Sequence, residues 1–464
     1  MGGPRVVIVG GGFGGLSCAR RLDGEAVDVL LVDAHNYHLF TPLLYQVATS
    51  LLNPSDIAYP LRRVFRRSPN VRFRQGTVAR LDPARRIVRL HNGTEIPYDV
   101  CVLATGSMNN YFGDPDLARF TIGLKHLEEA LRLRNHVLSC LERASHEPDA
   151  STRGAWLTFV VAGGGPTGVE YAGALGELLK MVLGRDYPEL HRHDARILLV
   201  EGKPRLLDAF PDSLGRYAER QLRRRGVEVL THTLVRSATH EAVSLSTGED
   251  IRTRTIVWSA GVRPTDPVRD AGIGIHRSAS GRIDVDDHLR VRGSPGLFAI
   301  GDVASVDADG AELAMLSPPA MQEGRYVARL IAMGAADGRA DIEATPPFRY
   351  IDKGTMATIG RNAAVARIGP FRLTGFVGWA AWLFIHLYYL IGFRNRLIVL
   401  AEWTWEYVRR DRPIRLIARV DPDPLARFGE ELVLDSPSGD DPDDPQAMRS
   451  PPAEADRGAA SESP

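Results

Sequence analysis

Two segments of the chain share one order of hydrophobic and polar positions. Residues 6–33 start with four apolar positions of β type, pass through a glycine-rich turn and enter a run with helical periodicity, and residues 159–201 repeat this order. Each segment closes with a second apolar run that leads to an acid, Asp33 or Glu201. This pattern predicts strand, turn, helix and strand, twice in one chain. The periodic runs place the two helices at 16–22 and 169–183.

The glycines of both turns follow the spacing G-x-G-x-x-G. The first glycine permits the tight bend, the second lets backbone approach a pyrophosphate, and the third lets helix and strand pack closely. Phosphates then lie at the positive end of the helix, and the acid accepts hydrogen bonds from an adenosine ribose. We expect two nucleotide-binding turns; glycine-rich turns without a ligand are the alternative. The residues concerned are Gly10, Gly12, Phe13, Gly14, Gly15 and Asp33 in the first unit, and Gly163, Gly165, Gly168 and Glu201 in the second.

The second unit is longer than the first. Glu201 lies well beyond the usual spacing of ~20 residues after the glycines, and residues 184–193 account for the excess as a surface excursion. Lys203 and Arg205 follow the acid and are candidates to receive a 2′-phosphate. A carboxylate at Glu201 would repel that phosphate, so the sequence favours NADH over NADPH.

Composition and cysteine usage exclude several classes of protein. The 464 residues carry 57 Lys+Arg against 57 Asp+Glu, which argues against nucleic acid as the main partner. The length predicts two or three domains. Cys18, Cys101 and Cys140 have neither C-x-x-C nor metal-ligand spacing, so we expect buried small side chains and no disulfide framework, metal site or dithiol centre. The first apolar run is already a strand, so no signal peptide is expected and the main body is expected in the cytoplasm.

Short motifs after each unit complete a family pattern. Apolar strands lead to Ala104, Thr105 and Gly106, to Gly261, and to Asp302. Together with the glycine turns, these motifs resemble the two-dinucleotide-binding-domain flavoproteins of the pyridine nucleotide-disulfide oxidoreductase superfamily. The resemblance implies one non-covalent FAD in the first unit, NAD(P)H in the second, and Asp302 beside the ribityl and pyrophosphate region of the flavin. The implied α/β fold has two Rossmann-like dinucleotide-binding domains, with FAD-binding parts at 1–120 and 276–340, an inserted NADH-binding domain at 155–275 and a C-terminal membrane-associating helical region at 345–420.

Three segments narrow the resemblance to type II NADH:quinone dehydrogenases. They are residues 36–48, 163–172 and 350–361. The resemblance implies that Glu170 lies near the nicotinamide, where it positions NADH or handles protons. The alternative is an acid near a helix N-terminus, favoured only by the helix dipole.

Two further residues follow from the same resemblance. Gln322 and Ala320 match the family's A-Q-x-A-x-Q element at the quinone face of the flavin, but Pro318 replaces its first Gln. One expected hydrogen bond to the quinone is therefore absent or supplied otherwise. Lys353 matches the family's Lys near flavin and quinone, where an ammonium stabilises negative charge and delivers a proton. Only four residues of this chain are lysines, which agrees with a specific role; a surface lysine after an edge strand is the alternative.

A hydrophobic stretch near the C-terminus predicts contact with a bilayer. Residues 376–393 contain His386 but no Lys, Arg, Asp or Glu, and four of the six tryptophans fall at 379–405. On a helix, Trp379, Trp382, His386 and Tyr389 share a stripe, which favours a helix lying in the interface over a spanning or buried core helix. The resemblance implies the same docking, at the cytoplasmic side of the cell membrane, usually as a homodimer. Residues 435–464 are rich in Asp, Pro and Ser and are expected to form a disordered acidic tail.

These inferences predict a membrane-bound FAD enzyme that oxidises NADH and reduces a respiratory quinone by two-electron transfer, without proton pumping. Two alternatives stay open. A soluble NAD(P)H-dependent reductase of a protein electron acceptor would share both glycine turns but would not need the aromatic C-terminal stretch. An NADH-sensing flavoprotein would share the turns but would not need Lys353 or Gln322.

Overall fold

The computed structural model describes residues 3–265, 275–308, 310–335, 344–409, 411–412 and 414–417. All of them belong to one compact unit, Met1–Ala418. The acidic tail predicted at 435–464 lies outside the described residues.

The first repeat unit builds the centre of a five-stranded parallel sheet with the order β21-β9-β1-β2-β5. Parallel strands are covered on both faces, which explains the continuous apolar runs in the sequence. The last strand, β21, comes from far along the chain, so the chain leaves this sheet and later returns to it. The strands are β1 (Arg5–Val9), β2 (Asp28–Asp33), β5 (Val71–Gln75), β9 (Val100–Leu103) and β21 (Leu297–Ala299).

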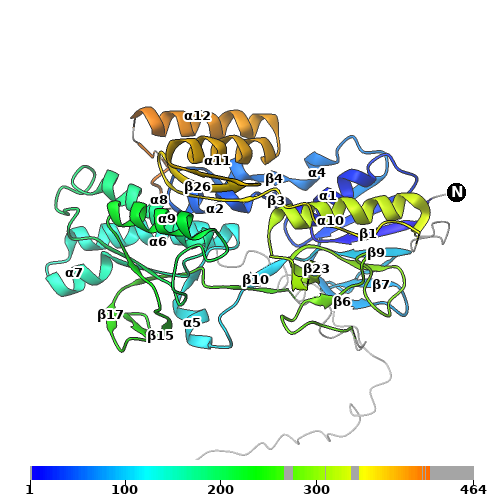
Figure 1. The fold of residues 1–464 in the computed structure, drawn as a ribbon, viewed down its shortest axis with the longest axis horizontal. Helices are drawn as coiled ribbons and strands as arrows, with labels where there is room; N and C mark the ends of the chain where they lie inside the picture. The colour runs from blue at the N-terminus through cyan, green and yellow to red at the C-terminus, as the bar shows by residue number, and fades with distance from the viewer. Residues whose placement is uncertain are drawn as a thin grey trace, which may run out of the picture. The chain divides into compact units, whose positions relative to one another are not determined.

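The second repeat unit builds the centre of a second parallel sheet with the order β11-β18-β12-β13-β14. In this sheet β12 lies between β13, which leads to Glu201, and β18, which leads to Gly261. In the first sheet β1 lies in the same way between β2 and β9. The repeat in sequence is therefore also a repeat in topology, and Figure 1 shows the two sheets in separate halves. The strands are β11 (Ile122–Gly123), β12 (Thr158–Ala162), β13 (Arg196–Val200), β14 (Val227–Leu230) and β18 (Thr255–Trp258).

The C-terminal region covers the second unit. A three-stranded antiparallel sheet packs on helix α8 (Pro166–Val182), so closely that a Cβ on Gly173 would lie 2.1 Å from the carbonyl oxygen of Ile359. Two further helices lie over this sheet at the top of Figure 1. The sheet comprises β25 (Thr355–Gly360), β26 (Ala363–Ile368) and β27 (Phe371–Thr374), and the helices are α11 (Gly375–Tyr389) and α12 (Phe393–Arg409).

Shorter elements complete the fold. On the first sheet, α1 (Phe13–Leu22) packs against α10 (Ser317–Leu330). The remaining helices and turns are η1 (Thr41–Leu43), α2 (Leu44–Ala48), α3 (Pro54–Ile57), α4 (Leu61–Val64), α5 (Pro115–Phe120), α6 (Leu127–His146), α7 (Ala150–Trp156), α9 (Asp212–Arg224), η2 (Gly301–Val303) and the π-helical turn η3 (Ile331–Ala335). The remaining strands are β3 (Tyr37–Leu39), β4 (Ala58–Pro60), β6 (Val78–Asp82), β7 (Ile87–Leu90), β8 (Glu95–Pro97), β10 (Ser107–Asn109), β15 (Val235–Ala238), β16 (Ala242–Leu245), β17 (Asp250–Arg252), β19 (Val262–Pro264), β20 (Ile283–Asp284), β22 (Ala304–Ser305), β23 (Asp307–Ala308) and β24 (Ala311–Glu312).

The two helices of the repeat begin three residues earlier than their periodicity predicts. Gly12 and Gly165 are the N-cap residues, so each helix starts directly after the second glycine of its turn. Hydrophobic periodicity does not detect this first turn, because its residues, 13–15 in α1 and 166–168 in α8, include glycines and show no repeating apolar position. The surface excursion at 184–193 is confirmed, since most of these residues are exposed.

The aromatic stripe expected on α11 lies towards the protein interior, and other residues form the exposed face of the helix. Trp382 is 1% exposed, and its ring stacks on that of His386 at 4.0 Å between centroids. The side chains on the outer face are Phe376, Val377, Phe384 and Tyr388. Among the residues that the structure describes, no helix has both the length and the hydropathy to cross a bilayer.

Candidate active site

The first glycine turn has the geometry of a nucleotide cradle. Gly10 has φ +107°, and a Cβ there would lie 2.2 Å from the carbonyl oxygen of Ala104. A Cβ on Gly15 would lie 1.8 Å from the carbonyl oxygen of Gly10, so only glycine allows this packing of helix on strand. In contrast, nothing lies within 4 Å of a Cβ on Gly12, which caps α1. The turn therefore leaves open space at the positive end of a helix.

The second glycine turn repeats these features. Gly163 has φ +106°, and a Cβ there would lie 2.5 Å from the carbonyl oxygen of Ser259. A Cβ on Gly168 would lie 1.9 Å from the carbonyl oxygen of Gly163, whereas Gly165 again faces open space. Gly261 follows Ser259 by two residues, as Gly106 follows Ala104. Two cradles of one design therefore occur in one chain.

The two acids are fixed in matching ways. Asp33 accepts hydrogen bonds from the backbone N–H of Gly11 at 2.5 Å and of His35 at 2.7 Å. Glu201 accepts from the N–H of Gly164 at 2.6 Å and of Lys203 at 2.7 Å. Each carboxylate thus holds its glycine turn and keeps further lone pairs for ribose hydroxyls.

Asp302 lies in η2, where the chain has returned to the first sheet. Its carboxylate accepts a hydrogen bond from the hydroxyl of Ser107 at 2.5 Å and lies 3.4 Å from the ammonium of Lys125. The sequence analysis missed both partners, because they come from distant segments without a motif of their own. They hold Asp302 beside the Thr105–Gly106 strand end, and the predicted site residues of the first unit therefore converge.

Helix α10 closes this side of the first cradle. Ala320 is buried, and a Cβ on Gly14 would lie 3.3 Å from its carbonyl oxygen. The next acid, Glu323, is buried and accepts a hydrogen bond from the Gly301 N–H at 2.5 Å. Burial raises the pKa of Glu323 to about 7. Glu323 was also missed, although its place directly after Gln322 could have directed attention to it.

Gln322 and Lys353 lie at the same loop. The amide of Gln322 accepts from the backbone N–H of Ile351 and donates to its carbonyl, both at 3.0 Å. Two residues later, the exposed ammonium of Lys353 lies 3.3 Å from the hydroxyl of Tyr389 on α11. Gln322 therefore positions the loop that carries Lys353, and α11 contacts the same loop.

Glu170 contacts β25, the strand that follows the Lys353 loop. It is buried on α8, where its carboxylate accepts the backbone N–H of Thr358 in β25 at 3.1 Å. Burial raises the pKa of Glu170 to about 8, and the Thr358 N–H offsets part of that rise. At neutral pH this group is mostly protonated and can donate a proton.

A buried polar chain behind Glu170 was missed by the sequence analysis. Gln46 of α2 donates to the hydroxyl of Tyr45 at 2.7 Å and accepts from the indole N–H of Trp403 at 2.8 Å. Tyr45 packs edge-on against Trp382, with ring centroids 6.4 Å apart. The segment 36–48 matched a family pattern, yet none of its residues was given a role. In the structure it connects the first unit to both C-terminal helices.

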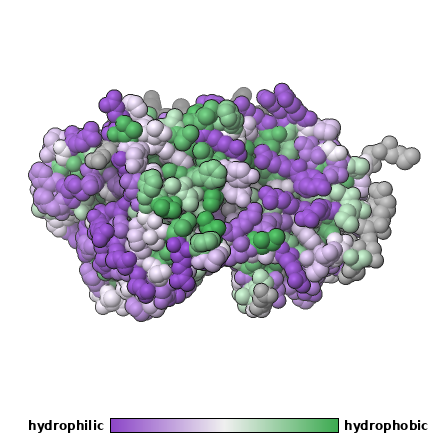
Figure 2. Space-filling model, turned by 45° about the horizontal axis from the view of Figure 1, so that its top comes forward, coloured by the Kyte–Doolittle hydropathy of each residue, from purple (hydrophilic) through white to green (hydrophobic). Residues whose placement is uncertain are grey.

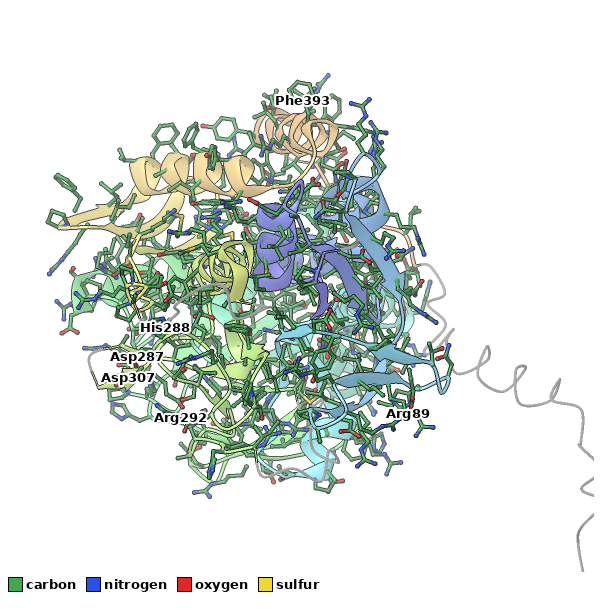
Figure 3. The ribbon with its side chains drawn as sticks, turned by 90° about the vertical axis from the view of Figure 1, so that its right-hand side faces the viewer. Arg89, Asp287, His288, Arg292, Asp307 and Phe393 are labelled. Carbon is green, nitrogen blue, oxygen red and sulfur yellow. The ribbon has the colours of Figure 1, made fainter. Side chains whose placement is uncertain are left out.

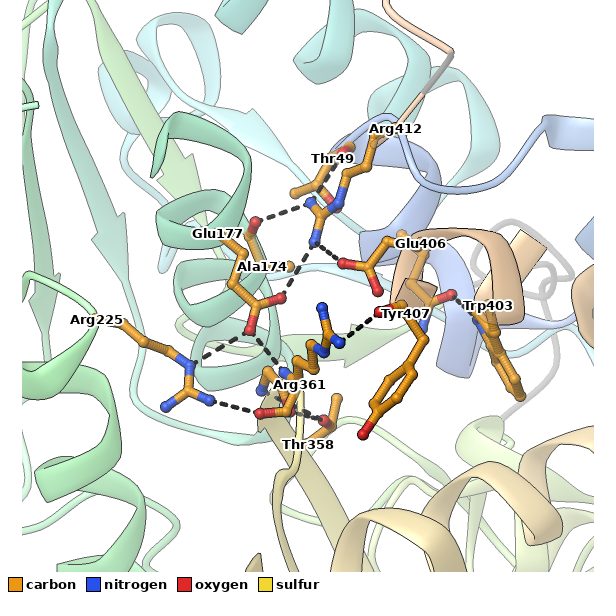
Figure 4. Close-up of polar contacts among 12 residues, drawn as sticks. Thr49, Ala174, Glu177, Arg225, Thr358, Arg361, Trp403, Glu406, Tyr407 and Arg412 are labelled. Atoms are coloured by element: carbon orange, nitrogen blue, oxygen red, sulfur yellow. Dashed lines mark hydrogen bonds and ion pairs between the residues drawn. The ribbon is translucent and has the colours of Figure 1, made fainter. Parts of the chain in front are cut away.

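The end of the described chain is tied to α8 by Arg412. This guanidinium is 1% exposed, donates to the carbonyl oxygens of Thr49 and Ala174, and pairs with Glu177 at 3.3 Å. Glu177 also accepts from the Arg361 N–H at 2.6 Å, so it links α8 to the loop after β25 (Figure 4). Glu177 lies two turns after Glu170 on one helix, and this clasp therefore fixes the helix that carries the candidate acid.

Metal and thiol chemistry have no site among the described residues. No group of three or more His, Cys, Asp and Glu could hold a metal ion there. The three cysteines are free and buried, as expected. Burial raises the pKa of Cys18 to about 12 and of Cys140 to about 11. A reactive thiolate is therefore absent from these three positions.

The first cradle fits the flavin dinucleotide that the sequence implies. The open space at Gly12, the fixed carboxylate of Asp33 and the inward-held Asp302 match a pyrophosphate, a ribose and a polyol chain in turn.

Comparison with known proteins gives one consistent family. The profile of the pyridine nucleotide-disulphide oxidoreductase family matches residues 4–324. The type II NADH:quinone oxidoreductase Ndh of Mycobacterium tuberculosis is 36% identical over 417 residues, 88% of this chain and 89% of that protein. NdhA of the same organism is 36% identical over 421 residues, 89% of this chain and 88% of that protein.

A solved structure shares the fold. NDH2 of Plasmodium falciparum in complex with NADH matches with a TM-score of 0.81 at 18% identity, over 90% of this chain and 100% of that chain. The predicted fold class and the predicted resemblance are confirmed. The chain therefore belongs to the pyridine nucleotide-disulphide oxidoreductase family and, within it, to the type II NADH:quinone oxidoreductases.

Proposed function

We propose that this chain oxidises NADH and reduces a respiratory quinone through one non-covalent FAD, without proton pumping. The observation that carries the proposal is the segment 350–360, which contacts Gln322 at one end and Glu170 at the other. Gln322 belongs to the helix that closes the first cradle, and Glu170 to the helix that starts at the second. A single segment thus connects the two nucleotide units.

FAD binds the first cradle and NADH the second. Within the proposal, the domain limits are 1–120 with 276–340 for FAD and 155–275 for NADH. The residues assigned to FAD are Gly10, Gly12, Phe13, Gly14, Gly15, Asp33, Ala104, Thr105, Gly106, Asp302 and Ala320. Those assigned to NADH are Gly163, Gly165, Gly168, Glu201 and Gly261.

When bound, FAD would supply the redox chemistry, namely acceptance of a hydride from NADH and transfer of two electrons to a quinone. The protein supplies geometry, charge and protons. Lys353 places an ammonium where negative charge develops on reduction. Glu170 holds a proton at neutral pH, since burial raises its pKa to about 8. Gln322 positions the Lys353 loop. Pro318 replaces the first Gln of the family element, so one hydrogen bond to the quinone is absent or supplied otherwise.

The outer face of α11 docks on the bilayer that contains the quinone. Phe376, Val377, Phe384, Tyr388 and the neighbouring Phe393 are each more than half exposed. Figure 2 shows hydrophobic side chains gathered on this face with hydrophilic ones on either side. In Figure 3, Phe393 lies at the outer edge of α12, whereas the labelled charged residues lie away from it. A contiguous apolar face with a polar surround is typical of an interfacial helix.

Arginines next to this face fit an anionic lipid surface, at the cytoplasmic side of the cell membrane. The N-terminus of α12 adjoins the segment around α3 and α4, since Asn395 donates to the carbonyl oxygens of Ser55 and Asp56. Exposed arginines follow on that segment and on α12 itself. They are Arg62, Arg63, Arg66, Arg67 and Arg394.

A second copy of the chain covers the exposed stripe of α12. Leu397, Leu400, Ala401, Thr404, Trp405 and Val408 line a shallow groove with the helical spacing of a packing face. Sedimentation of the purified protein tests the homodimer: we expect a dimer that Leu400→Asp with Val408→Asp converts to a monomer, and a monomeric parent protein would contradict it.

Anaerobic consumption of NADH and a short-chain quinone tests the reaction. We expect equal amounts of the two to disappear, with no other protein present. NADH oxidation that requires a protein acceptor would favour a soluble reductase, and tight NADH binding without turnover would favour a sensor.

A further inference from the structure

The loop that follows Glu201 lies directly on the second glycine turn. The backbone N–H of Lys203 donates to Glu201, and that of Leu207 donates to the carbonyl oxygen of Gly164 at 2.9 Å. The first of these bonds sets Lys203 beside the carboxylate assigned to the adenosine ribose. Lys203 therefore lies beside the position assigned to the 2′-hydroxyl or 2′-phosphate, and its ion-pair partner Asp208 belongs to the same loop.

Both cations of this loop are held by one carboxylate. The ammonium of Lys203 lies 2.9 Å from Oδ2 of Asp208, and Nε of Arg205 lies 3.2 Å from Oδ1 of the same residue. Arg205 also pairs with Asp212 at the start of α9. The side chain of Lys203 is 63% exposed and that of Asp208 is 38% exposed, so a ligand can reach this cluster.

Asp208 keeps its charge across the physiological range. The hydrogen bond from Lys203 lowers the pKa of Asp208, and Arg205 acts in the same direction. An incoming 2′-phosphate would thus meet three carboxylates, Glu201, Asp208 and Asp212, and two cations that already have partners. Exposed ion pairs are weak, so the effect of Asp208 on phosphate binding is expected to be moderate.

We propose that Asp208 is a specificity-determining residue, which excludes NADPH by occupying Lys203 and Arg205, and that these two cations form a latent 2′-phosphate site. This inference rests on the proposed binding of NADH at the second cradle. Glu201 repels the phosphate directly, whereas Asp208 pairs with Lys203 and Arg205, the two cations that would bind the phosphate. The two acids act by different routes, but both contact Lys203, so replacing both is expected to have a larger effect than replacing either one alone.

Binding of adenosine 2′,5′-bisphosphate to the FAD-loaded protein, measured by calorimetry, tests this proposal without any turnover. Asp208→Asn is expected to tighten binding of this probe roughly tenfold, while ADP, which lacks the 2′-phosphate, binds as before. Asp208→Asn with Glu201→Gln is expected to bind the probe more tightly than either single variant. Asp250→Asn, which removes an exposed acid from β17 of the same unit, is the matched charge control and is expected to change nothing.

A second set of variants tests whether Lys203 and Arg205 are responsible for the tighter binding. Lys203→Ala and Arg205→Ala, added to Asp208→Asn, are expected to abolish the gain. A gain that survives both replacements, or no gain in Asp208→Asn, would overturn the proposal while ADP binding leaves the assigned NADH site intact. Failure of the parent protein to bind ADP would overturn the NADH site itself, and the specificity proposal with it.

Discussion

At the scale of single residues, the candidate site contains two acidic side chains that are buried away from water. Glu170 and Glu323 are buried acids on different helices, and burial raises the pKa of the first to about 8 and of the second to about 7. Each accepts one backbone N–H and faces no cation in hydrogen-bond contact among the described residues. Near pH 7, Glu170 is therefore mostly protonated and Glu323 partly protonated, and in this form both can give a proton.

Glu170→Gln is expected to change how stability depends on pH. The folded pKa of about 8 lies above the ordinary value of 4.5, so the folded protein holds a proton that the unfolded chain has lost. The free energy of unfolding of the parent protein therefore falls as the pH rises from 4.5 towards 8, and Gln removes this loss. We expect the variant to gain on the order of 3 kcal/mol over the parent between pH 5 and pH 9.

Thermal unfolding across that pH range measures the difference. Glu323 is present in both proteins, so its own titration cancels. A constant difference between variant and parent at all pH values would show that Glu170 does not titrate with a raised pKa.

Single residues also mark where the sequence could not predict the site. Gln322 and Lys353 were found from their motifs, but a motif does not reveal that both polar groups of the Gln322 amide bind Ile351. Ser107, Lys125 and Glu323 escaped prediction because each acts through a partner far away in the chain. Such contacts follow from the tertiary arrangement and have no local pattern.

At the scale of elements, the glycine turns were predictable, because each is complete within a short stretch of chain. The two turns also match in geometry. Gly10 and Gly163 have φ angles of +107° and +106°, and the third glycine of each turn lies close to the carbonyl oxygen of the first. The starts of α1 and α8 were placed three residues late, since the capping glycines interrupt the periodicity. The sheet of β25, β26 and β27 was not predicted, as its register depends on packing against α8.

The repeat offers a matched pair of variants, Gly15→Ala and Gly168→Ala. Each adds a Cβ less than 2 Å from a backbone oxygen, so each is expected to displace its own helix from its own strand. Gly15→Ala should purify with less than about a tenth of the parent's flavin, as a displaced helix end no longer presents its N–H groups to the pyrophosphate. Gly168→Ala should keep its flavin but resist reduction by NADH.

Flavin absorbance of the purified proteins, before and after NADH, distinguishes these outcomes. Equal flavin content in both variants, or loss of flavin only in Gly168→Ala, would contradict the assignment of the two units.

At the scale of the whole molecule, the C-terminal region joins both nucleotide units. Arg412, which is 1% exposed, interacts with Thr49 at the end of α2, with Ala174 and Glu177 of α8, and with Glu406 of α12 (Figure 4). Arg412→Met would leave Glu177 and Glu406 without this partner. We expect a loss of about 3 kcal/mol in stability, because removal of one member of a buried ion pair leaves an uncompensated charge.

Arg415→Met is the matched control for this clasp. Arg415 is 27% exposed and pairs with Asp186 and Asp411, so its loss should cost less than about 1 kcal/mol. Denaturant unfolding of both variants gives the comparison, and equal losses would show that Arg412 is no more than a surface contact.

Membrane docking belongs to the same scale. Phe384→Ser with Phe393→Ser removes two of the most exposed aromatic side chains of the C-terminal helices. Binding to vesicles with anionic lipid should weaken by roughly a hundredfold, since each ring contributes about 1.5 kcal/mol or more on burial. NADH oxidation with a water-soluble quinone should persist.

Met333→Ser is the control for this experiment, because Met333 is an exposed apolar residue outside the C-terminal helices. Unchanged vesicle binding of the double variant would place the docking surface elsewhere.

The central claim is that electrons pass from NADH through the flavin to a quinone, and stopped-flow flavin absorbance measures each half in turn. The account predicts that NADH bleaches the flavin and that a short-chain quinone then restores its absorbance quickly. Bleaching without recovery on quinone would contradict the quinone reaction, and a flavin that NADH leaves oxidised would contradict the role of the second cradle.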